Sequence, residues 1–313
     1  MELPMAVSIR EVGPRDGLQA EAPVPVEGRV RLVDALGATG VRRIEVGSFV
    51  SPRAVPAMAG TGEVFARIRR YPGVVYSALA LNRRGAEDAL AAAADRLQVV
   101  VAASESYNQR NANRTIAQSL EEVAGVVRLA SQATPPVPVD GTVSTAWGCP
   151  YEGEVPAERV VELAKRLGDL GCQAISLGDT TGMASPTRVE ALLDALAAAG
   201  IDPATRVNCH FHDTRGAALA NLLAALLHGC RDFDTAVGGL GGSPTAPGAG
   251  GNVSSEDAVH MLEDMGVDTG IDLGRLLEAA RLAEELLGHP LRSQVLVAGP
   301  RDAARAAGKG AWR

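Results

Sequence analysis

The chain contains few cysteines and no long apolar run, and both absences narrow its class. Its four cysteines show no paired spacing, which argues against a disulfide framework and suits a reducing compartment. No apolar segment approaches the ~20 residues that an α-helix needs to cross a bilayer, and the N-terminal residues lack the pattern of a signal peptide. We therefore predict a cytoplasmic protein without a membrane partner.

An excess of basic charge is also missing. The chain has 30 Lys and Arg residues against 37 Asp and Glu residues, a formal net charge of −7, and its basic residues are scattered. Nucleic acids and anionic membrane surfaces are bound through clustered positive charge, so neither is an expected partner. By contrast, 46% hydrophobic residues over 313 positions suffice for a large buried core in one domain.

What the chain does contain is a regular alternation of short β-branched runs and longer helical patterns. Eight runs are predicted as strands: Val7–Glu11, Arg43–Gly47, Val74–Leu79, Leu97–Ala102, Val137–Val143, Ala174–Leu177, Arg206–His210 and Phe233–Val237. This rhythm predicts a (β/α)8 TIM barrel as a single catalytic domain at 5–270, followed by a C-terminal helical extension and loose tail at 271–313. A doubly wound sheet shares the alternation, but no G-x-G-x-x-G motif follows the first strand, which weakens a dinucleotide-binding version.

Two histidines one residue apart, His210 and His212, stand at the end of the seventh predicted strand. Side chains at i and i+2 project from the same face of a strand, so the two imidazoles aim at one point. Imidazole is the commonest metal ligand among side chains, and the pair therefore indicates a metal site. A pair of hydrogen-bonded buried histidines would produce the same pattern.

Carboxylates stand near the carboxyl ends of other predicted strands. Asp16 follows the first strand, Glu45 lies between apolar neighbours in the second, and Asp179 follows the sixth. Active sites of (β/α)8 barrels form at this end, so these groups are expected to converge on one rim with the histidines. A cation held there would offset the cost of burying carboxylates.

Each carboxylate also has a purely structural explanation. Asp16 precedes a glycine and could cap a turn. Glu45 could be an ion-pair partner for Arg15 or Arg43, and Asp179 could cap the entry of the next helix. The expected convergence of all of them on one rim favours a functional site over these separate explanations.

Five segments carry a family resemblance: Val12–Gln19 (VGPRDGLQ), Ile44–Pro52 (IEVGSFVSP), Gly148–Gly153 (GCPYEG), Cys209–Thr214 (CHFHDT) and Gly239–Gly242 (GLGG). They resemble 3-hydroxy-3-methylglutaryl-CoA lyases, which belong to a larger group of metal-dependent carbon–carbon lyases and Claisen-type synthases on the same barrel. The Arg-Asp-Gly and His-x-His combination points to the larger group, whereas GCPYEG and FVSP narrow it to the lyase branch. The resemblance covers roughly residues 5–300 in unbroken order.

The resemblance implies a divalent cation, Mg²⁺ or Mn²⁺, held by Asp16, His210, His212 and Asn252. A ligand set of two nitrogens, a carboxylate and an amide oxygen suits such an ion, whereas a structural zinc site typically uses thiolates. Cys209, next to the histidines, is expected to face the core because strand alternation turns it away from them. An acyl-CoA substrate and a homodimer are also implied.

The implied activity is retro-Claisen cleavage of a 3-hydroxyacyl-CoA, with 3-hydroxy-3-methylglutaryl-CoA giving acetoacetate and acetyl-CoA. The metal would lower the pKa of the substrate hydroxyl, a base would take its proton, and Arg15 would stabilise the oxyanion of the acetyl-CoA enolate. His210, Glu45 and Asp179 are the candidate bases, and the sequence does not rank them. The segment 107–114 after the fourth strand could contact coenzyme A or form a solvated loop.

One position departs from the family pattern. In these lyases the glycine-rich loop, here 238–251, carries a catalytic cysteine directly after Gly-Leu-Gly-Gly, where this chain has Ser243. An alcohol is a far weaker acid than a thiol and needs a base or a water relay to move a proton. We expect Ser243 to take that role in a slow or relay-based lyase. The alternatives are a lyase for a related substrate such as citramalyl-CoA, a Claisen-type acyltransferase, and a catalytically impaired paralogue.

Overall fold

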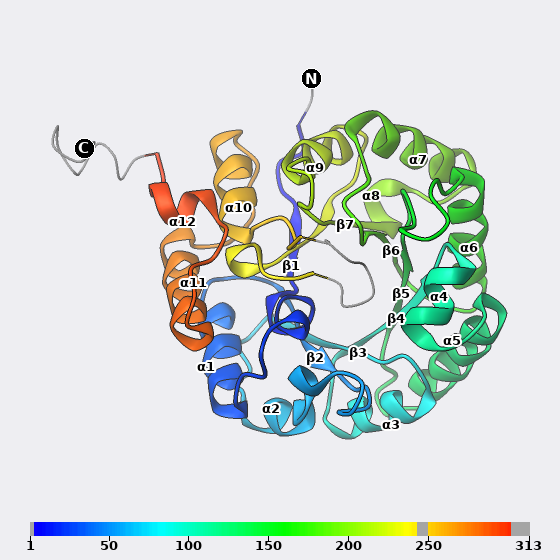
Figure 1. Ribbon diagram of the computed structural model, residues 1–313, viewed down its shortest axis with the longest axis horizontal. Helices are drawn as coiled ribbons and strands as arrows, with labels where there is room; N and C mark the ends of the chain where they lie inside the picture. The colour runs from blue at the N-terminus through cyan, green and yellow to red at the C-terminus, as the bar shows by residue number, and fades with distance from the viewer. Residues whose placement is uncertain (1–2, 243–249, 302–313) are drawn as a thin grey trace, which may run out of the picture.

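The computed structural model describes residues 3–242 and 250–301 of the chain. Eight parallel strands close into a barrel in sequence order, with β1 pairing with both β2 and β8, and helices form a ring outside them (Figure 1). The predicted (β/α)8 TIM barrel is confirmed. The strands are β1 (Ser8–Glu11), β2 (Arg43–Ser48), β3 (Val75–Leu79), β4 (Arg96–Ala102), β5 (Val139–Ser144), β6 (Ile175–Asp179), β7 (Val207–Phe211) and β8 (Asp232–Thr235).

Helices connect these strands and follow the last of them. The α-helices are α1 (Val26–Gly37), α2 (Thr61–Arg67), α3 (Arg83–Ala91), α4 (Glu105–Ala112), α5 (Ile116–Ser131), α6 (Ala157–Asp169), α7 (Pro186–Ala198), α8 (Pro203–Arg206), α9 (Ala218–Leu227), α10 (Ser255–Asp264), α11 (Leu273–Leu287) and α12 (Gln294–Ala298). Short turns of other helical types are η1 (Gly13–Gly17), η2 (Leu18–Ala20), η3 (Pro56–Met58) and η4 (Val237–Gly239).

Each strand predicted from its β-branched run is present, and its ends lie within two residues of the expected ones. The solvated-loop alternative for 107–114 is wrong over most of its length, because those residues form α4 up to Ala112. Ser104 caps this helix by accepting a hydrogen bond from the backbone N–H of Tyr107 at 3.1 Å. The polar composition of the segment concealed a short helix.

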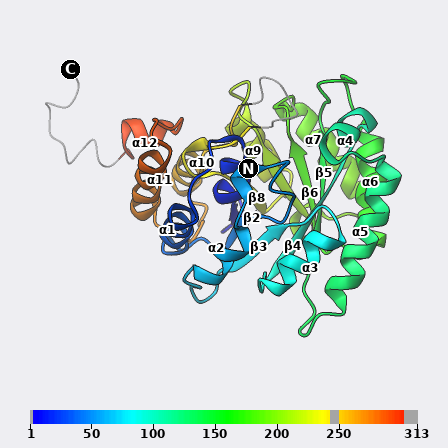
Figure 2. The ribbon, with the colours of Figure 1, turned by 60° about the horizontal axis from the view of Figure 1, so that its bottom comes forward.

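The C-terminal helices lie against the start of the barrel wall. Helix α11 packs along α1 and α10, and the two views place it beside α1 (Figures 1 and 2). The division between a barrel at 5–270 and an extension at 271–313 stays a prediction. Within the described ranges, no helix combines the length and the apolar composition needed to cross a membrane.

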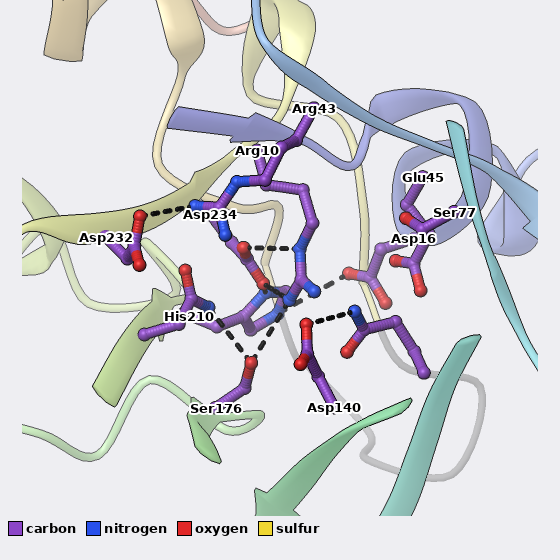
Figure 3. Close-up of polar contacts among 12 residues, drawn as sticks. Arg10, Asp16, Arg43, Glu45, Ser77, Asp140, Ser176, His210, Asp232 and Asp234 are labelled. Atoms are coloured by element: carbon purple, nitrogen blue, oxygen red, sulfur yellow. Dashed lines mark hydrogen bonds and ion pairs between the residues drawn. The ribbon is translucent and has the colours of Figure 1, made fainter. Parts of the chain in front are cut away.

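The barrel interior is polar, whereas the apolar core lies between the strands and the helices. In β1, Ile9 belongs to the apolar core while its buried neighbour Arg10 makes its hydrogen bonds inside the barrel. Barrels of this class usually fill their interior with branched apolar side chains. Here the interior holds a polar layer (Figure 3), with buried members Arg10, Glu45, Ser77, Asp140, Ser176 and Asp234.

Candidate metal centre and cavity

Asp16, His210 and His212 form a compact buried cluster at the carboxyl end of the barrel. Asp16 lies in η1, directly after β1, His210 lies in β7, and His212 follows that strand. The two Nε2 atoms are 3.1 Å apart, and Asp16 Oδ2 is 3.5 Å from His212 Nε2 and 3.8 Å from His210 Nε2. The sequence-based expectation that these three side chains converge is therefore met.

The spacing of these atoms fits a divalent cation. Ligand atoms at adjacent corners of an octahedral ion, with bonds of ~2.1 Å, stand ~3.0 Å apart, which is close to the separations in the cluster. His210 Nδ1 lies 3.1 Å from Asp234 Oδ2. His212 Nδ1 lies 2.9 Å from the carbonyl oxygen of Gly250. These acceptors favour a proton on each Nδ1, which leaves both Nε2 lone pairs for a metal.

Asn252 joins the cluster from the far end of the glycine-rich loop. A backbone bridge pairs it with His212, and its Nδ2 donates to Asp16 Oδ2 at 2.8 Å and to the carbonyl oxygen of Leu240 at 2.9 Å. Its Oδ1 is buried and has no hydrogen-bond partner among the described residues. An orphaned amide oxygen in a residue that touches the cluster is the kind of atom that a cation satisfies.

The charges around the cluster favour metal-binding protonation states. Burial opposes ionisation of Asp16, but Arg15 and the two histidines outweigh it and hold its pKa at about 2. Burial lowers the pKa of His212 to about 4. Burial also acts to lower the pKa of His210, yet Asp234 and Asp16 reverse the effect and raise it. Carboxylates and neutral imidazoles are the forms that bind metals, so a cation would compete mainly with the proton of His210.

Arg15 links the cluster to Glu45. Its Nε donates to Glu45 Oε2 at 2.7 Å and its Nη1 donates to Asp16 Oδ1 at 2.5 Å. The ion-pair explanation for Glu45 is therefore correct for Arg15, while Arg43 pairs with Asp232 at 2.7 Å. The other carboxylate oxygen of Glu45, Oε1, is buried without a partner among the described residues.

A cavity of about 140 Å³ opens beside the cluster. Arg15, Asp16, Glu45 and both histidines contribute its polar wall. Its apolar wall consists of Val50, Val55, Leu79, Leu81 and Val100. The cavity can therefore hold a charged reacting group at one side and an alkyl group at the other.

A bulge in β2 brings a further hydroxyl to this cavity. The pairing of β2 with β3 shifts register between Glu45 and Gly47, and Ser48 lines the cavity together with Glu45. Regular alternation would send residues three apart to opposite faces, so sequence reasoning did not single out Ser48. Its Oγ is buried without a partner in the described ranges, which leaves it available to a ligand.

Asp179 is a predicted site residue that does not line the cavity, and Asn252, although it contacts Asp16, does not line it either. Asp179 Oδ1 accepts hydrogen bonds from the backbone N–H groups of Met183 at 2.8 Å and Ala184 at 3.1 Å. Both residues precede Ser185, the N-cap of α7, so Asp179 holds the loop that leads to this helix and does not cap the helix itself. Burial raises its pKa to about 7. Its neighbours Gly178 and Thr180 line the cavity instead, because successive residues of β6 face opposite sides.

The segment that carries GCPYEG braces α4 at the edge of the cavity. Tyr107 and Asn111 of α4 line the cavity. The Arg110 guanidinium lies 4.3 Å from the ring centroid of Tyr151, and Glu152 accepts a hydrogen bond from the first turn of α4 at 2.6 Å. These contacts hold the cavity-lining face of α4 in place.

Gly242, the last described residue of the first part of the glycine-rich loop, lines the cavity. Ser243, the residue expected to replace the family's cysteine, lies outside the described residues. Cys209 is buried and free, and it belongs to the apolar core as expected. No described cysteine lines the cavity.

Two buried carboxylates hold the backbone at the end of β8. Glu11 accepts hydrogen bonds from the N–H groups of Gly13 at 2.7 Å and Val237 at 2.9 Å, and Glu256 accepts one from Gly238 at 3.0 Å. Burial raises the pKa of both carboxyls to about 7. The start of the glycine-rich loop is thus anchored to groups that titrate near neutrality.

We expect Glu11→Gln to flatten the pH dependence of stability. A carboxyl whose pKa is higher in the folded chain binds more protons when folded, so its contribution to the free energy of unfolding falls between pH 4.5 and about 7. Each such group changes the free energy of unfolding by up to ~1.4 kcal/mol per pH unit. Glutamine mimics the neutral carboxyl, so Glu11→Gln should remove the pH-dependent contribution of this residue. Urea unfolding near pH 5 and near pH 7 measures it.

Glu154→Gln is the control for this prediction, because the Glu154 side chain is 92% exposed. It should leave the difference in stability between the two pH values unchanged. The same unchanged difference in Glu11→Gln would contradict the argument from burial.

A closed (β/α)8 barrel with a carboxylate, two histidines and an asparagine gathered at its mouth defines a TIM-barrel protein with a candidate divalent-metal centre. Comparison with known proteins narrows this class. The family model described as HMGL-like matches residues 6–283, and the chain belongs to that family.

The relatives agree with the family. The 3-hydroxy-3-isohexenylglutaryl-CoA/hydroxymethylglutaryl-CoA lyase of Pseudomonas aeruginosa is 47% identical over 92% of this chain and 95% of its own length. A hydroxymethylglutaryl-CoA lyase of Bacillus subtilis is 43% identical over 95% of this chain and 98% of its own length. Among solved structures, an HMG-CoA lyase from Acinetobacter baumannii, in complex with coenzyme A and 3-methylmalate, has a TM-score of 0.91 at 41% identity, covering 95% of this chain and 96% of that one. The resemblance seen in the sequence motifs is confirmed.

Proposed function

We propose that this chain cleaves 3-hydroxy-3-methylglutaryl-CoA to acetoacetate and acetyl-CoA, with Mg²⁺ or Mn²⁺ held by Asp16, His210, His212 and Asn252. The observation that carries the proposal is the buried Asp16–His210–His212 cluster at the wall of the cavity. The relatives are named as lyases of this substrate, and this supports the proposal. They do not favour the acyltransferase or the impaired paralogue.

The reaction moves one proton off the substrate and returns one to carbon. Loss of the proton from the tertiary hydroxyl lets the oxygen's electron pair form the ketone of acetoacetate as the neighbouring C–C bond breaks. The electrons of that bond form the enolate of acetyl-CoA, and protonation of the enolate carbon completes the second product. A bound divalent cation supplies the Lewis acidity that lowers the pKa of the hydroxyl.

Among the candidate bases, the geometry favours Glu45. His210 has both ring nitrogens committed, Nδ1 to a carboxylate and Nε2 to the cluster, and Asp179 does not line the cavity. Glu45 lines it and has one buried oxygen without a partner among the described residues. Arg15, which bonds Glu45 and lines the cavity, would stabilise the developing enolate oxyanion.

The lining of the cavity suits two parts of this substrate, the substituent at C3 and coenzyme A. The apolar wall around Val50, Leu79 and Leu81 would receive the substituent at C3. Coenzyme A would approach along the face of α4 that carries Tyr107 and Asn111. A homodimer and a cytoplasmic location stay predictions from the sequence.

The test is a cleavage assay on metal-stripped protein. 3-Hydroxy-3-methylglutaryl-CoA, its 3-isohexenyl analogue and citramalyl-CoA are incubated with Mg²⁺ or Mn²⁺, and the acyl-CoA products are identified by mass spectrometry. We expect the first compound to give acetyl-CoA and acetoacetate, with activity that EDTA abolishes and Mn²⁺ restores. No turnover of any compound with the metal bound would favour the impaired paralogue. Release of free coenzyme A from acetyl-CoA and a 2-oxo acid would favour the acyltransferase.

The return of the glycine-rich loop requires glycine at 251. A Cβ on Gly251 would stand 1.8 Å from the carbonyl oxygen of Gly239, so the two ends of the loop must separate in Gly251→Ala. Because Asn252 follows directly, we expect it to shift within the cluster. A misplacement of ~1 Å typically costs ~10²-fold in rate, and steady-state kinetics at saturating metal should show a loss of this size.

Gly62→Ala is the matched control, because its Cβ would meet its nearest neighbour at an ordinary 3.7 Å. It should retain the activity of the unmodified chain. Full activity in Gly251→Ala as well would show that the loop relaxes without moving the ligand that follows it.

A further inference from the structure

An ion pair beneath the metal cluster reaches one of its histidines. Arg10 of β1 and Asp234 of β8 are 4% and 2% exposed, and the parallel register of these strands places them side by side. His210 of β7 is paired in register with Asp234 from the other side. Three adjacent strands thus bring these side chains to one level of the barrel (Figure 3).

Asp234 uses both of its carboxylate oxygens. Arg10 Nε donates to Oδ1 at 2.8 Å, and Arg10 Nη2 donates to Oδ2 at 2.6 Å. Oδ2 also lies 3.1 Å from His210 Nδ1. The forked contact with the guanidinium fixes the plane of the carboxylate, so His210 meets an acceptor with one defined position.

A contribution to stability alone does not account for this arrangement. Taking two charges out of water offsets much of their attraction, so a buried ion pair is weak evidence for stability. The barrel holds another ion pair with a buried carboxylate, Arg96 with Asp140 at 2.6 Å, in which the Arg96 side chain is 26% exposed, and Asp140 is bonded further to Gln98. The pair at Asp234 differs because its additional bond goes to a residue of the metal cluster.

The two histidines of the cluster are oriented by different means. His212 Nδ1 faces a backbone carbonyl, that of Gly250, at the returning end of the glycine-rich loop. His210 Nδ1 faces a carboxylate inside the barrel. A carboxylate acceptor selects the tautomer with the proton on Nδ1 and strengthens Nε2 as a ligand.

We propose that Asp234, held by Arg10, is a positioning residue that fixes the ring and the tautomer of His210, so that Nε2 faces Asp16 and His212. The inference rests on the proposed metal site and explains how that site is kept ready before a cation arrives. Asp234 also lines the cavity, but in this role it acts through His210 and is not itself a metal ligand.

Metal affinity of the full-length, metal-stripped protein tests this role. Asp234→Asn keeps the size of the side chain but offers one acceptor oxygen to donors from both Arg10 and His210. We expect the affinity for Mn²⁺, measured by calorimetric titration, to fall ~10–100-fold, the usual effect of losing such a partner. Cleavage activity should recover at saturating Mn²⁺, which a damaged fold would not allow.

Asp140→Asn is the matched control. It removes another buried carboxylate that is paired with an arginine, so it reports the general effect of losing such a charge where the carboxylate does not contact the metal cluster. Its Mn²⁺ affinity should equal that of the unmodified chain. Equal affinity in Asp234→Asn would overturn the inference, as would an equal loss in both variants.

A second measurement does not depend on turnover or on the folding of Asp234→Asn. ¹⁵N NMR of histidine-labelled, metal-free protein, at a pH where the rings are neutral, should show His210 with its proton on Nδ1. Arg10→Lys keeps the charge but loses the forked contact, and it should give a mixture of tautomers. A proton on Nε2 in the unmodified chain would refute the positioning role. Failure to bind Mn²⁺ or to cleave any substrate would instead count against the proposed function, while the tautomer still decides this inference.

Discussion

His212→Ala should abolish divalent-metal binding and, with it, cleavage. The substitution removes one of the two imidazoles and the atom that lies 3.5 Å from Asp16 Oδ2, so the cluster loses one of its two nitrogen ligands. Lewis-acid stabilisation is worth several kcal/mol, which corresponds to a loss of ~10³-fold or more in rate. Metal content after dialysis, determined by elemental analysis, and circular dichroism of the same sample give the readout.

The fold should survive this change. The backbone bonds around position 212, from Asp213 N–H to the Gly251 carbonyl and from Val253 N–H to the Phe211 carbonyl, do not involve the imidazole. His228→Ala is the control, because His228 is a half-buried histidine that contacts the backbone of α9. It should bind metal at full stoichiometry. Unchanged metal content in His212→Ala would refute the assignment of the cluster.

Ser243→Cys should raise lyase activity by ~10²–10⁴-fold, the range that a positioned proton donor contributes. The reason lies in the acidities of the two groups, since a thiol with a pKa near ~8.5 can be tuned to exchange a proton around neutrality. Residue 243 follows Gly242, which lines the cavity. Initial rates on 3-hydroxy-3-methylglutaryl-CoA at saturating Mn²⁺ measure the gain.

A thiol introduced elsewhere separates this effect from general thiol chemistry. Ser131→Cys places one at the exposed end of α5 and should leave the rate unchanged. If Ser243→Cys is no faster with its metal site filled, then another acid delivers the proton or the physiological substrate differs.

The fold could be predicted from the sequence because its signals are local. Each β-branched run is long enough to mark one strand, and the helical spacing between runs fixes the alternation. The convergence of the rim residues Asp16, His210 and His212 could also be predicted from the sequence, because the ends of parallel strands meet at one edge. The neighbours of each residue along the chain were enough to place it.

The remaining parts of the site depend on contacts between strands, which no single segment encodes. Ser48 reaches the cavity only because β2 carries a bulge. Asp234 meets His210 and Arg10 through the lateral register of three strands. Asp179 accepts hydrogen bonds from the backbone of the loop before α7 and does not line the cavity, an outcome that its own segment does not encode.

The backbone bridge between His212 and Asn252 ties the returning end of the glycine-rich loop to the end of β7. The start of the same loop is held at Gly238 by Glu256, so both described margins are anchored by groups outside the stretch between them. We therefore expect substitutions between the two margins to alter proton transfer or substrate range more readily than metal binding.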